Sequence, residues 1–240
     1  YNLTFFNLKV MRFTFCLILP SLIFAESSAL TASQPNSIFN PNNQDEEKGY
    51  VRNATIASTV SSHIQIGNRK NIGIASFLIS ANESANLNLV PVLLGSIKIS
   101  WNLVLTGRTS AFSNENKAIN IYGWGLSYKP GQEDKISPWT VRVNSGTYRS
   151  FNTIRSSSFS LSLSRNISLK NFDILLGFSS NNVNGINYQD NQNIVSQNFK
   201  YNFNTIIFGT TVGFMGIKIL PSINYNSDDF TMLIGLQKEF

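Results

Sequence analysis

The chain has 240 residues, of which 42% are hydrophobic and only 13% charged. Its net charge of +6 is modest and spread along the chain, which excludes the clustered basic patch that nucleic-acid binding requires. After residue 25 no stretch is long and apolar enough for a transmembrane helix, so a helical membrane protein is excluded as well.

The first 25 residues predict a cleaved secretory signal peptide (1–25). We expect the residues before Met11 to lie upstream of the true start, and Arg12 supplies the positive charge that precedes the apolar stretch 13–24. Cleavage is expected after Ala25. A membrane anchor is the alternative, but a bilayer span needs about 20 apolar residues and this stretch is shorter.

Cys16 is the only cysteine and lies in the signal, so the mature chain has no disulfide and must be stabilised by burial or by a closed hydrogen-bond network.

The region after the signal differs in composition from the rest of the chain. Residues 26–54 are rich in Asn and Pro and predict a polar leader, with a first strand near residues 37–40 as an alternative. We expect the main domain to span residues 55–240.

From residue 55 onward the apolar residues recur with a period of two, which is typical of strands with two different faces. Apolar side chains at Phe159, Leu161 and Leu163 alternate with serines, as lipid-facing and lumen-facing residues do in a membrane barrel. The expected strands are 55–67, 71–80, 86–93, 97–107, 117–129, 137–149, 156–166, 170–180, 200–214, 216–226 and 229–240.

The turns test whether these strands belong to one closed sheet. A loop with an even number of residues must move the outward face between odd and even numbering, whereas an odd loop must preserve it. The two-residue turn Met215-Gly216 and the four-residue loop 226–229 both switch the numbering of the apolar face. A three-residue turn at Leu94-Gly95-Ser96 is expected to preserve it.

The last strand alternates up to the final residue of the chain. Its outward residues are Phe230, Met232, Ile234, Leu236 and Phe240, and Lys238 stands where an aromatic residue is usual. This ending resembles the sorting signal of Gram-negative outer-membrane β-barrel proteins. The resemblance implies a location in the bacterial outer membrane, contact with its lipids, and recognition by the barrel assembly machinery.

These patterns predict an all-β fold, a transmembrane antiparallel up-and-down β-barrel of about 12 strands, with 10 as the alternative. Eleven strands are counted, whereas bacterial single-chain barrels have an even number and both termini in the periplasm. A further strand before residue 50 favours twelve. The short turns 94–96 and 215–216 are then periplasmic, and residues 108–116 and 181–199 form external loops.

The expected interior is net basic. Lumen-lining positions, with Lys200 and Glu239 as further candidates, are predicted at Lys98, Arg142, Lys218, Asp173 and His63. Inward basic side chains raise the local concentration of anions in a pore. The alternative is a plugged interior in which acidic groups neutralise these cations.

Aromatic residues on outward faces near strand ends predict the interfacial girdle of a membrane barrel. They are Trp101, Tyr122, Trp124, Tyr128 and Trp139. The alternative is the ordinary aromatic content of a β-sheet.

Catalysis is not expected. His63 is the only histidine, which excludes sites built from paired histidines and makes a Ser-His hydrolase difficult to assemble. No catalytic residue, metal or cofactor is therefore predicted.

Two functions fit these features. The first is a passive porin-like channel for small solutes, with a preference for anions. The alternative is a non-conducting outer-membrane barrel that has a structural role or binds a partner through external loops 108–116 and 181–199. A secreted β-sandwich, in which the outward residues form a core, is a third reading, and the pattern carries no signal for an oligomeric state.

Overall fold

The computed structural model describes residues 55–59, 66–67, 70–81, 88–114, 117–133, 137–150, 154–170, 172–189, 195–226 and 230–240. All of them belong to one compact unit, Pro41–Phe240. The predicted signal peptide, the leader 26–54 with its first strand, and His63 lie outside the described residues. Within these residues no helix is long and apolar enough to cross a membrane.

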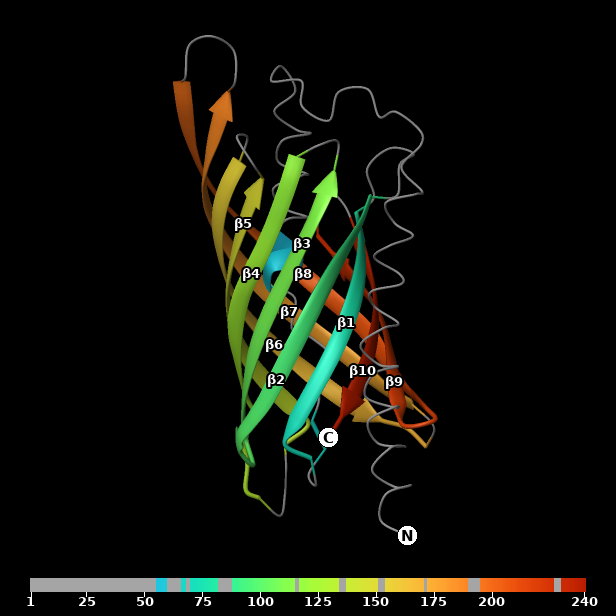
Figure 1. Ribbon diagram of the computed structural model, residues 1–240. Coiled ribbons are helices and arrows are strands. Elements are labelled where there is room, and N and C mark those ends of the chain that lie inside the picture. Colours follow the sequence, from blue (N-terminus) through green and yellow to red (C-terminus); the bar gives the residue numbers. More distant parts are fainter. Residues whose placement is uncertain are drawn as a thin grey trace. The chain divides into compact units, whose positions relative to one another are not determined.

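Ten strands form a closed antiparallel barrel in the described part of the chain, and each strand pairs with its neighbours in sequence (Figure 1). Their bounds are β1 Ile72–Ala81, β2 Asn88–Ser100, β3 Leu103–Asn114, β4 Lys117–Tyr128, β5 Trp139–Ser150, β6 Ile154–Ser168, β7 Phe172–Gln189, β8 Val195–Phe214, β9 Ile217–Tyr225 and β10 Phe230–Glu239. Ten is the smaller of the two numbers that the sequence allowed. The strand expected at 55–67 is wrong over residues 55–59, which form a short helical turn.

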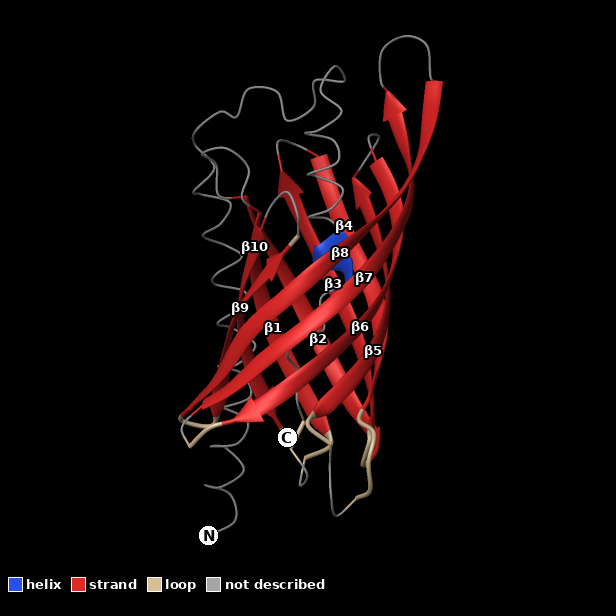
Figure 2. Cartoon of the chain, turned by 180° about the vertical axis from the view of Figure 1, so that it is seen from behind, coloured by secondary structure: helices blue, strands red, loops and turns tan. Residues whose placement is uncertain are grey.

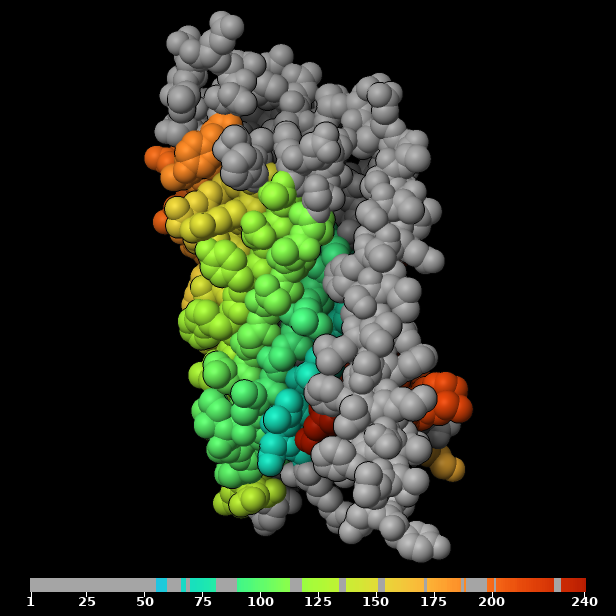
Figure 3. All heavy atoms as spheres, viewed as in Figure 1, coloured from blue at the N-terminus to red at the C-terminus, as the bar shows by residue number. Residues whose placement is uncertain are grey.

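The alternation read from the sequence separates an outer surface from a lumen. Along β6 the serines at even positions from 156 to 164 are buried, whereas Phe159, Leu161 and Leu163 are about half exposed on the outside. Side chains of β2 to β5 cover the outside of the wall without a break (Figure 3). A continuous outer band of large apolar side chains around a closed sheet is the surface of a barrel that spans a bilayer.

The first and last strands close the barrel. β10 pairs with β9 on one side and with β1 on the other. At the end of this seam Phe240 donates its amide to the Ile72 carbonyl at 2.9 Å, and the Phe240 carbonyl accepts the Asn71 amide at 3.1 Å. The barrel is therefore closed between its first and last strands, whereas residues 195–205 of β8 extend past β9 and, among the described strands, pair only with β7.

Two of the predicted turns have the expected effect on register. Met215 and Gly216 have φ angles of 49° and 79°, the left-handed conformation of a two-residue type I′ hairpin turn. Phe214 therefore faces Ile217, and across the next loop Tyr225 faces Phe230. Both connections switch the outward face between even and odd numbering, as predicted.

The turn expected at Leu94-Gly95-Ser96 is wrong, because these residues lie inside β2. The chain reverses instead at Trp101-Asn102, and the register shifts by one residue between Lys98 and Ser100. A two-residue turn plus one bulged residue has the same effect on parity as a three-residue loop. The odd-numbered face therefore stays outside across β2 and β3, which explains why the sequence pattern misplaced the turn.

The long external loops are also wrong, because most of their residues extend strands. Residues 108–114 belong to β3, and residues 181–189 and 195–199 belong to β7 and β8. The β7–β8 hairpin stands above the neighbouring strands at the end of the barrel opposite Phe240 (Figure 1). We call that end the distal mouth and the end that carries Phe240 the C-terminal mouth.

Candidate functional site

The lumen has two sectors with different linings. The apolar sector is lined mainly by buried apolar side chains of β9, β10, β1 and β2: Ala75, Phe77, Ile79, Val92, Leu94, Leu220 and Leu233. Among the described residues, the same strands also bury five polar side chains: Ser96, Ser222, Asn224, Thr231 and Gln237. The polar sector is lined mainly by buried side chains of β3 to β8: Arg108, Asn144, Ser158, Ser160, Ser162, Ser179, Asn181 and Thr205.

One row of paired residues crosses the polar sector. Arg108 of β3 faces Gly123 of β4, Gly123 faces Gly146 of β5, and Gly146 faces Ser158 of β6. The two glycines have no side chain, so they form a recess in the wall between a long cation and a hydroxyl. We call these four residues the docking row.

The helical turn 55–59 lies inside the barrel against this row, where Figure 2 shows it as the blue helix behind the strands. The Ser58 carbonyl accepts a hydrogen bond from Arg108 Nη1 at 2.9 Å. Ser58 Oγ lies 2.7 Å from Ser158 Oγ. Both ends of the docking row therefore hold the same residue of the turn.

The turn is stabilised locally by its own hydroxyl groups. Ser58 Oγ and Thr59 Oγ1 both donate to the Thr55 carbonyl, at 2.9 and 2.8 Å. A single helical turn leaves most of its backbone groups without a backbone partner, and such local side-chain hydrogen bonds supply one. Ile56 and Ala57 are buried in the lumen, so the turn contributes apolar as well as polar contacts.

The glycines of the docking row are required by close approach. A Cβ atom on Gly146 would lie 2.2 Å from the Ser58 carbonyl oxygen, and one on Gly123 would lie 2.8 Å from it. Both distances are shorter than van der Waals contact, so any larger residue would displace the turn. A neighbouring glycine, Gly125, leaves the same kind of space for Arg108 Nη2.

Arg108 is 4% exposed, and among the described residues its guanidinium bonds only neutral acceptors. Besides the Ser58 carbonyl, it donates from Nη2 to Asn144 Oδ1 at 3.1 Å. Burial of a cation is costly without such partners. Removing the turn would take away one of the two acceptors, so Arg108 and residues 55–59 depend on each other.

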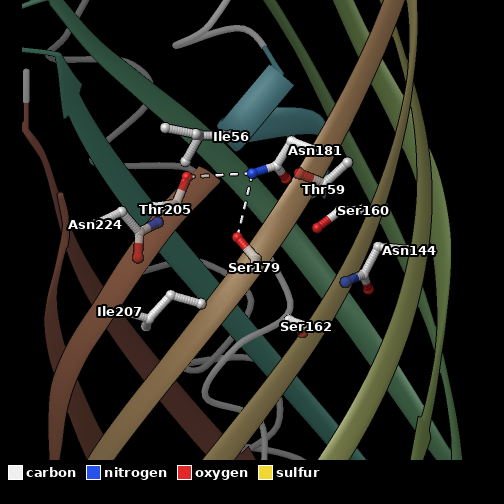
Figure 4. A pocket seen from close by; sticks show the side chains of 10 residues that line it. All are labelled: Ile56, Thr59, Asn144, Ser160, Ser162, Ser179, Asn181, Thr205, Ile207 and Asn224. Atoms are coloured by element: carbon white, nitrogen blue, oxygen red, sulfur yellow. Dashed lines mark hydrogen bonds between the residues drawn. The ribbon is translucent and has the colours of Figure 1, made fainter. Parts of the chain in front are cut away.

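A small cavity of about 30 Å³ remains beside the turn. Figure 4 shows Ile56 and Thr59 facing the strand wall across it, with Asn181 Nδ2 donating to Ser179 Oγ and Thr205 Oγ1, both at 3.2 Å. Asn224, which also lines the cavity, has a buried Oδ1 without a partner among the described residues. A water molecule needs about 10–15 Å³, so the cavity holds roughly two waters.

The predicted inward residues lie near the C-terminal mouth. Arg142 is 1% exposed and donates to Ser164 Oγ at 2.5 Å. Lys98 and Asp173 are half-buried on inward faces, and Lys218 forms an ion pair with Glu239. One of these inward cations, Lys218, therefore has an acidic partner.

Lys129, just beyond the end of β4, joins this group. Its pKa is lowered mainly by burial and then by repulsion from Arg142, Lys218 and Lys98, while Glu239 acts in the opposite direction. We call Lys98, Lys129, Arg142 and Lys218 the mouth cluster.

Other predicted residues have different positions. Lys200, a candidate for the lumen, is exposed and shares the outward even-numbered face of β8 with Ile206 and Phe208. Among the predicted girdle residues, Trp101 is half-buried in the β2–β3 turn, and the other four are exposed on outward faces of β4 and β5.

The sequence pattern did not predict a role for Arg108, Gly123 and Gly146. Arg108 was assigned to an external loop, although its even number places it on the same inward face as Thr106 and Ser110. Glycines at inward positions of an otherwise polar face are a signal of close backbone approach. That signal indicates that another segment of the chain approaches the wall from inside the lumen, but it does not identify the segment.

Comparisons with known proteins give only low similarities. No family model matches the chain, and no curated protein matches its sequence. Among solved structures, the N-terminal β-barrel domain of Pseudomonas aeruginosa OprF has a TM-score of 0.35 at 11% identity, covering 72% of this chain and 100% of that one. The KdgM porin has a TM-score of 0.39 at 11% identity, covering 70% and 99%.

The outer membrane protein AlkL, solved in DMPC bilayers, has a TM-score of 0.32 at 9% identity and covers 75% of this chain and 95% of that one. Likenesses of this size carry no information on what the chain binds or transports. The closed antiparallel barrel is defined by the strand pairing of the chain itself.

Proposed function

We propose that this protein is an outer-membrane barrel whose lumen is closed by its own residues 55–59, and that it acts through its outer surface rather than by passing solutes. The observation that carries the proposal is the double attachment of Ser58 to Arg108 and Ser158 inside the polar sector. The role requires no catalytic group, metal or cofactor.

The size of the barrel supports a closed lumen. An eight-stranded barrel is just filled by its own side chains, so ten strands leave a limited excess of space. The helical turn occupies part of that excess, and the cavity beside it measures about 30 Å³. A cavity of that size does not admit a hydrated solute at the level of the turn.

The location rests on the outer surface and on the predicted signal peptide. The apolar outer band fits a bilayer, and the predicted signal peptide fits export from the cytoplasm. Bacterial barrels have their termini in the periplasm. The C-terminal mouth would therefore face the periplasm, and the β7–β8 hairpin would face the outside of the cell.

The proposal is tested by conductance. The mature chain and a variant lacking residues 55–59 are refolded, checked for barrel formation by circular dichroism, and recorded in planar bilayers. We expect no steps from the intact chain and discrete steps from the deletion variant. Steady conductance of the folded intact chain would contradict the proposal.

The position of the turn is tested by disulfide cross-linking. The mature chain, residues 26–240, is used because it lacks Cys16 and so contains no other cysteine. A Ser58→Cys/Ser158→Cys pair should form a disulfide readily, because the two hydroxyl oxygens lie 2.7 Å apart. The matched control is Ser58→Cys/Ser157→Cys, since Ser157 is exposed on the outward face of the same strand. Equal yields in both pairs would place residue 58 elsewhere.

A second candidate is an anion-selective channel that opens when residues 55–59 leave the lumen. The mouth cluster favours it, because inward cations near one entrance attract anions. Ion selectivity of the deletion variant is the measurement. Reversing Lys98, Arg142 and Lys218 to Glu should move its reversal potential toward cation preference, and an unchanged potential would rule out these residues as the selectivity determinants.

A further inference from the structure

Arginine side chains bracket the apolar outer band on β5 and β6. Near the C-terminal mouth, Arg165 faces Trp139 and stacks on its ring at 5.6 Å. Toward the distal mouth, Arg149 faces Arg155 directly across the same two strands. Arg149 lies 5.8 Å from the centre of the Tyr122 ring.

The spacing of these two rows matches a membrane. They are ten residues apart along each strand, which corresponds to about 33 Å of strand and, at the usual tilt of 35–45°, to about 25 Å along the membrane normal. The apolar band of a membrane barrel has this height. The row of Arg149 and Arg155 therefore lies at the level of the lipid headgroups on the distal side.

This distal row is unusual in its charge. Arg149 and Arg155 are both exposed, and like charges directly opposite each other destabilise a sheet. Neither has an ion-pair partner among the described residues. The described carboxylates, Glu133, Asp173 and Glu239, all belong to the C-terminal mouth.

A groove next to Arg155 adds polar groups to this charge. Its volume is about 460 Å³, and its walls include Arg155, Ser157, Asn184, Phe199 and Lys200. Ser157 faces Asn184 across β6 and β7, and Asn184 faces Lys200 across β7 and β8. Two cations thus flank a hydroxyl and an amide that are able to donate hydrogen bonds.

The geometry points to a binding site for the phosphate headgroup of an anionic membrane lipid, formed by Arg155 and Lys200 with Arg149 beside it. Arginine binds phosphate through two parallel N–H···O bonds, and a lysine adds charge. An acyl chain attached to the same headgroup would lie along the apolar band immediately below. The inference rests on the proposed membrane location but not on the state of the lumen.

The experiment uses the folded mature chain in zwitterionic micelles, titrated with a short-chain phosphatidic acid, with bound lipid counted by native mass spectrometry. Phosphatidylcholine of the same chain length and inorganic phosphate are the comparison probes. The variant is Arg155→Gln/Lys200→Gln. The charge-matched control is Arg165→Gln/Lys170→Gln, which removes two exposed cations at the other end of the band.

We expect the dissociation constant for phosphatidic acid to rise about tenfold or more in Arg155→Gln/Lys200→Gln and to stay unchanged in the control. Arg155→Lys should lose part of the binding, because it keeps the charge but not the two parallel N–H···O bonds. Equal binding by the wild type and the Gln variant would overturn the inference, and so would an equal loss in the control. Competition by inorganic phosphate at the same concentration as the lipid would assign the site to free phosphate.

A failure here is distinguishable from a failure of the proposed function. The lipid titration reads the outer surface, whereas the conductance experiment reads the lumen. A conducting barrel that binds phosphatidic acid through Arg155 would contradict only the closed-lumen proposal.

Discussion

The two sectors of the lumen fill the same kind of space in different ways. In the apolar sector, large side chains of the strands fill it themselves, as where the Phe77 ring lies over Gly235 of the facing strand. In the polar sector the lining residues are mostly small, and a separate segment, residues 55–59, occupies the space.

This difference separates stability from closure. Truncating a large side chain of the apolar sector leaves a cavity, because the paired strands cannot move together to fill it. The cavity lowers the free energy of unfolding. Disturbing the polar sector displaces a short segment while the strand ladder stays intact.

The largest effect is expected from Phe77→Ala. Phe77 is fully buried in the apolar sector, so its truncation should lower the free energy of unfolding by about 3–5 kcal/mol. Urea unfolding of the protein in lipid vesicles, followed by tryptophan fluorescence, measures the loss.

The matched control is Phe208→Ala on the outward face of β8. Lipid closes around the shortened side chain, so only the transfer free energy of about 1.5–3 kcal/mol is lost. Equal losses for the two variants would mean that the apolar sector is not closely packed.

A smaller effect is expected from Gly146→Ala in the docking row. The added methyl overlaps the Ser58 carbonyl, so the turn must move, at a cost of about 1–3 kcal/mol. Displacement should also lower the yield of the Ser58→Cys/Ser158→Cys disulfide. Gly107→Ala is the control, because a Cβ at this neighbouring position of β3 has nothing within 4 Å. An undiminished disulfide yield in Gly146→Ala would contradict the close fit.

The smallest effect is the pH dependence caused by Lys129. Its pKa is lowered in the folded protein, so the unfolded state binds more protons between that pKa and the ordinary lysine value of about 10.4. The free energy of unfolding should therefore rise with pH through this window. Lys129→Met should remove this contribution, as measured by urea unfolding at several pH values. An identical pH slope in the variant would contradict the burial of Lys129.

Much of the barrel was predictable because its signals are local. A period of two fixes which side chains share a face, and the parity of a loop fixes how that face continues. The switch at Met215-Gly216 and the inward position of Arg142 follow from these rules alone. The turn between β2 and β3 was misplaced because a bulge and a two-residue turn together give the same parity as a three-residue turn.

The sequence by itself determined an alternating all-β chain with an apolar outer face and basic residues on the inner one. Tertiary structure decided how the lumen is filled, since the apolar spacing from Ile56 to Ile66 suits a strand as well as a buried turn. The choice depends on Arg108, Gly123, Gly146 and Ser158, which come from four strands and meet only after the sheet has closed. Contacts between residues far apart in the chain leave no periodic trace in it, which is why the docking row could not be read in advance.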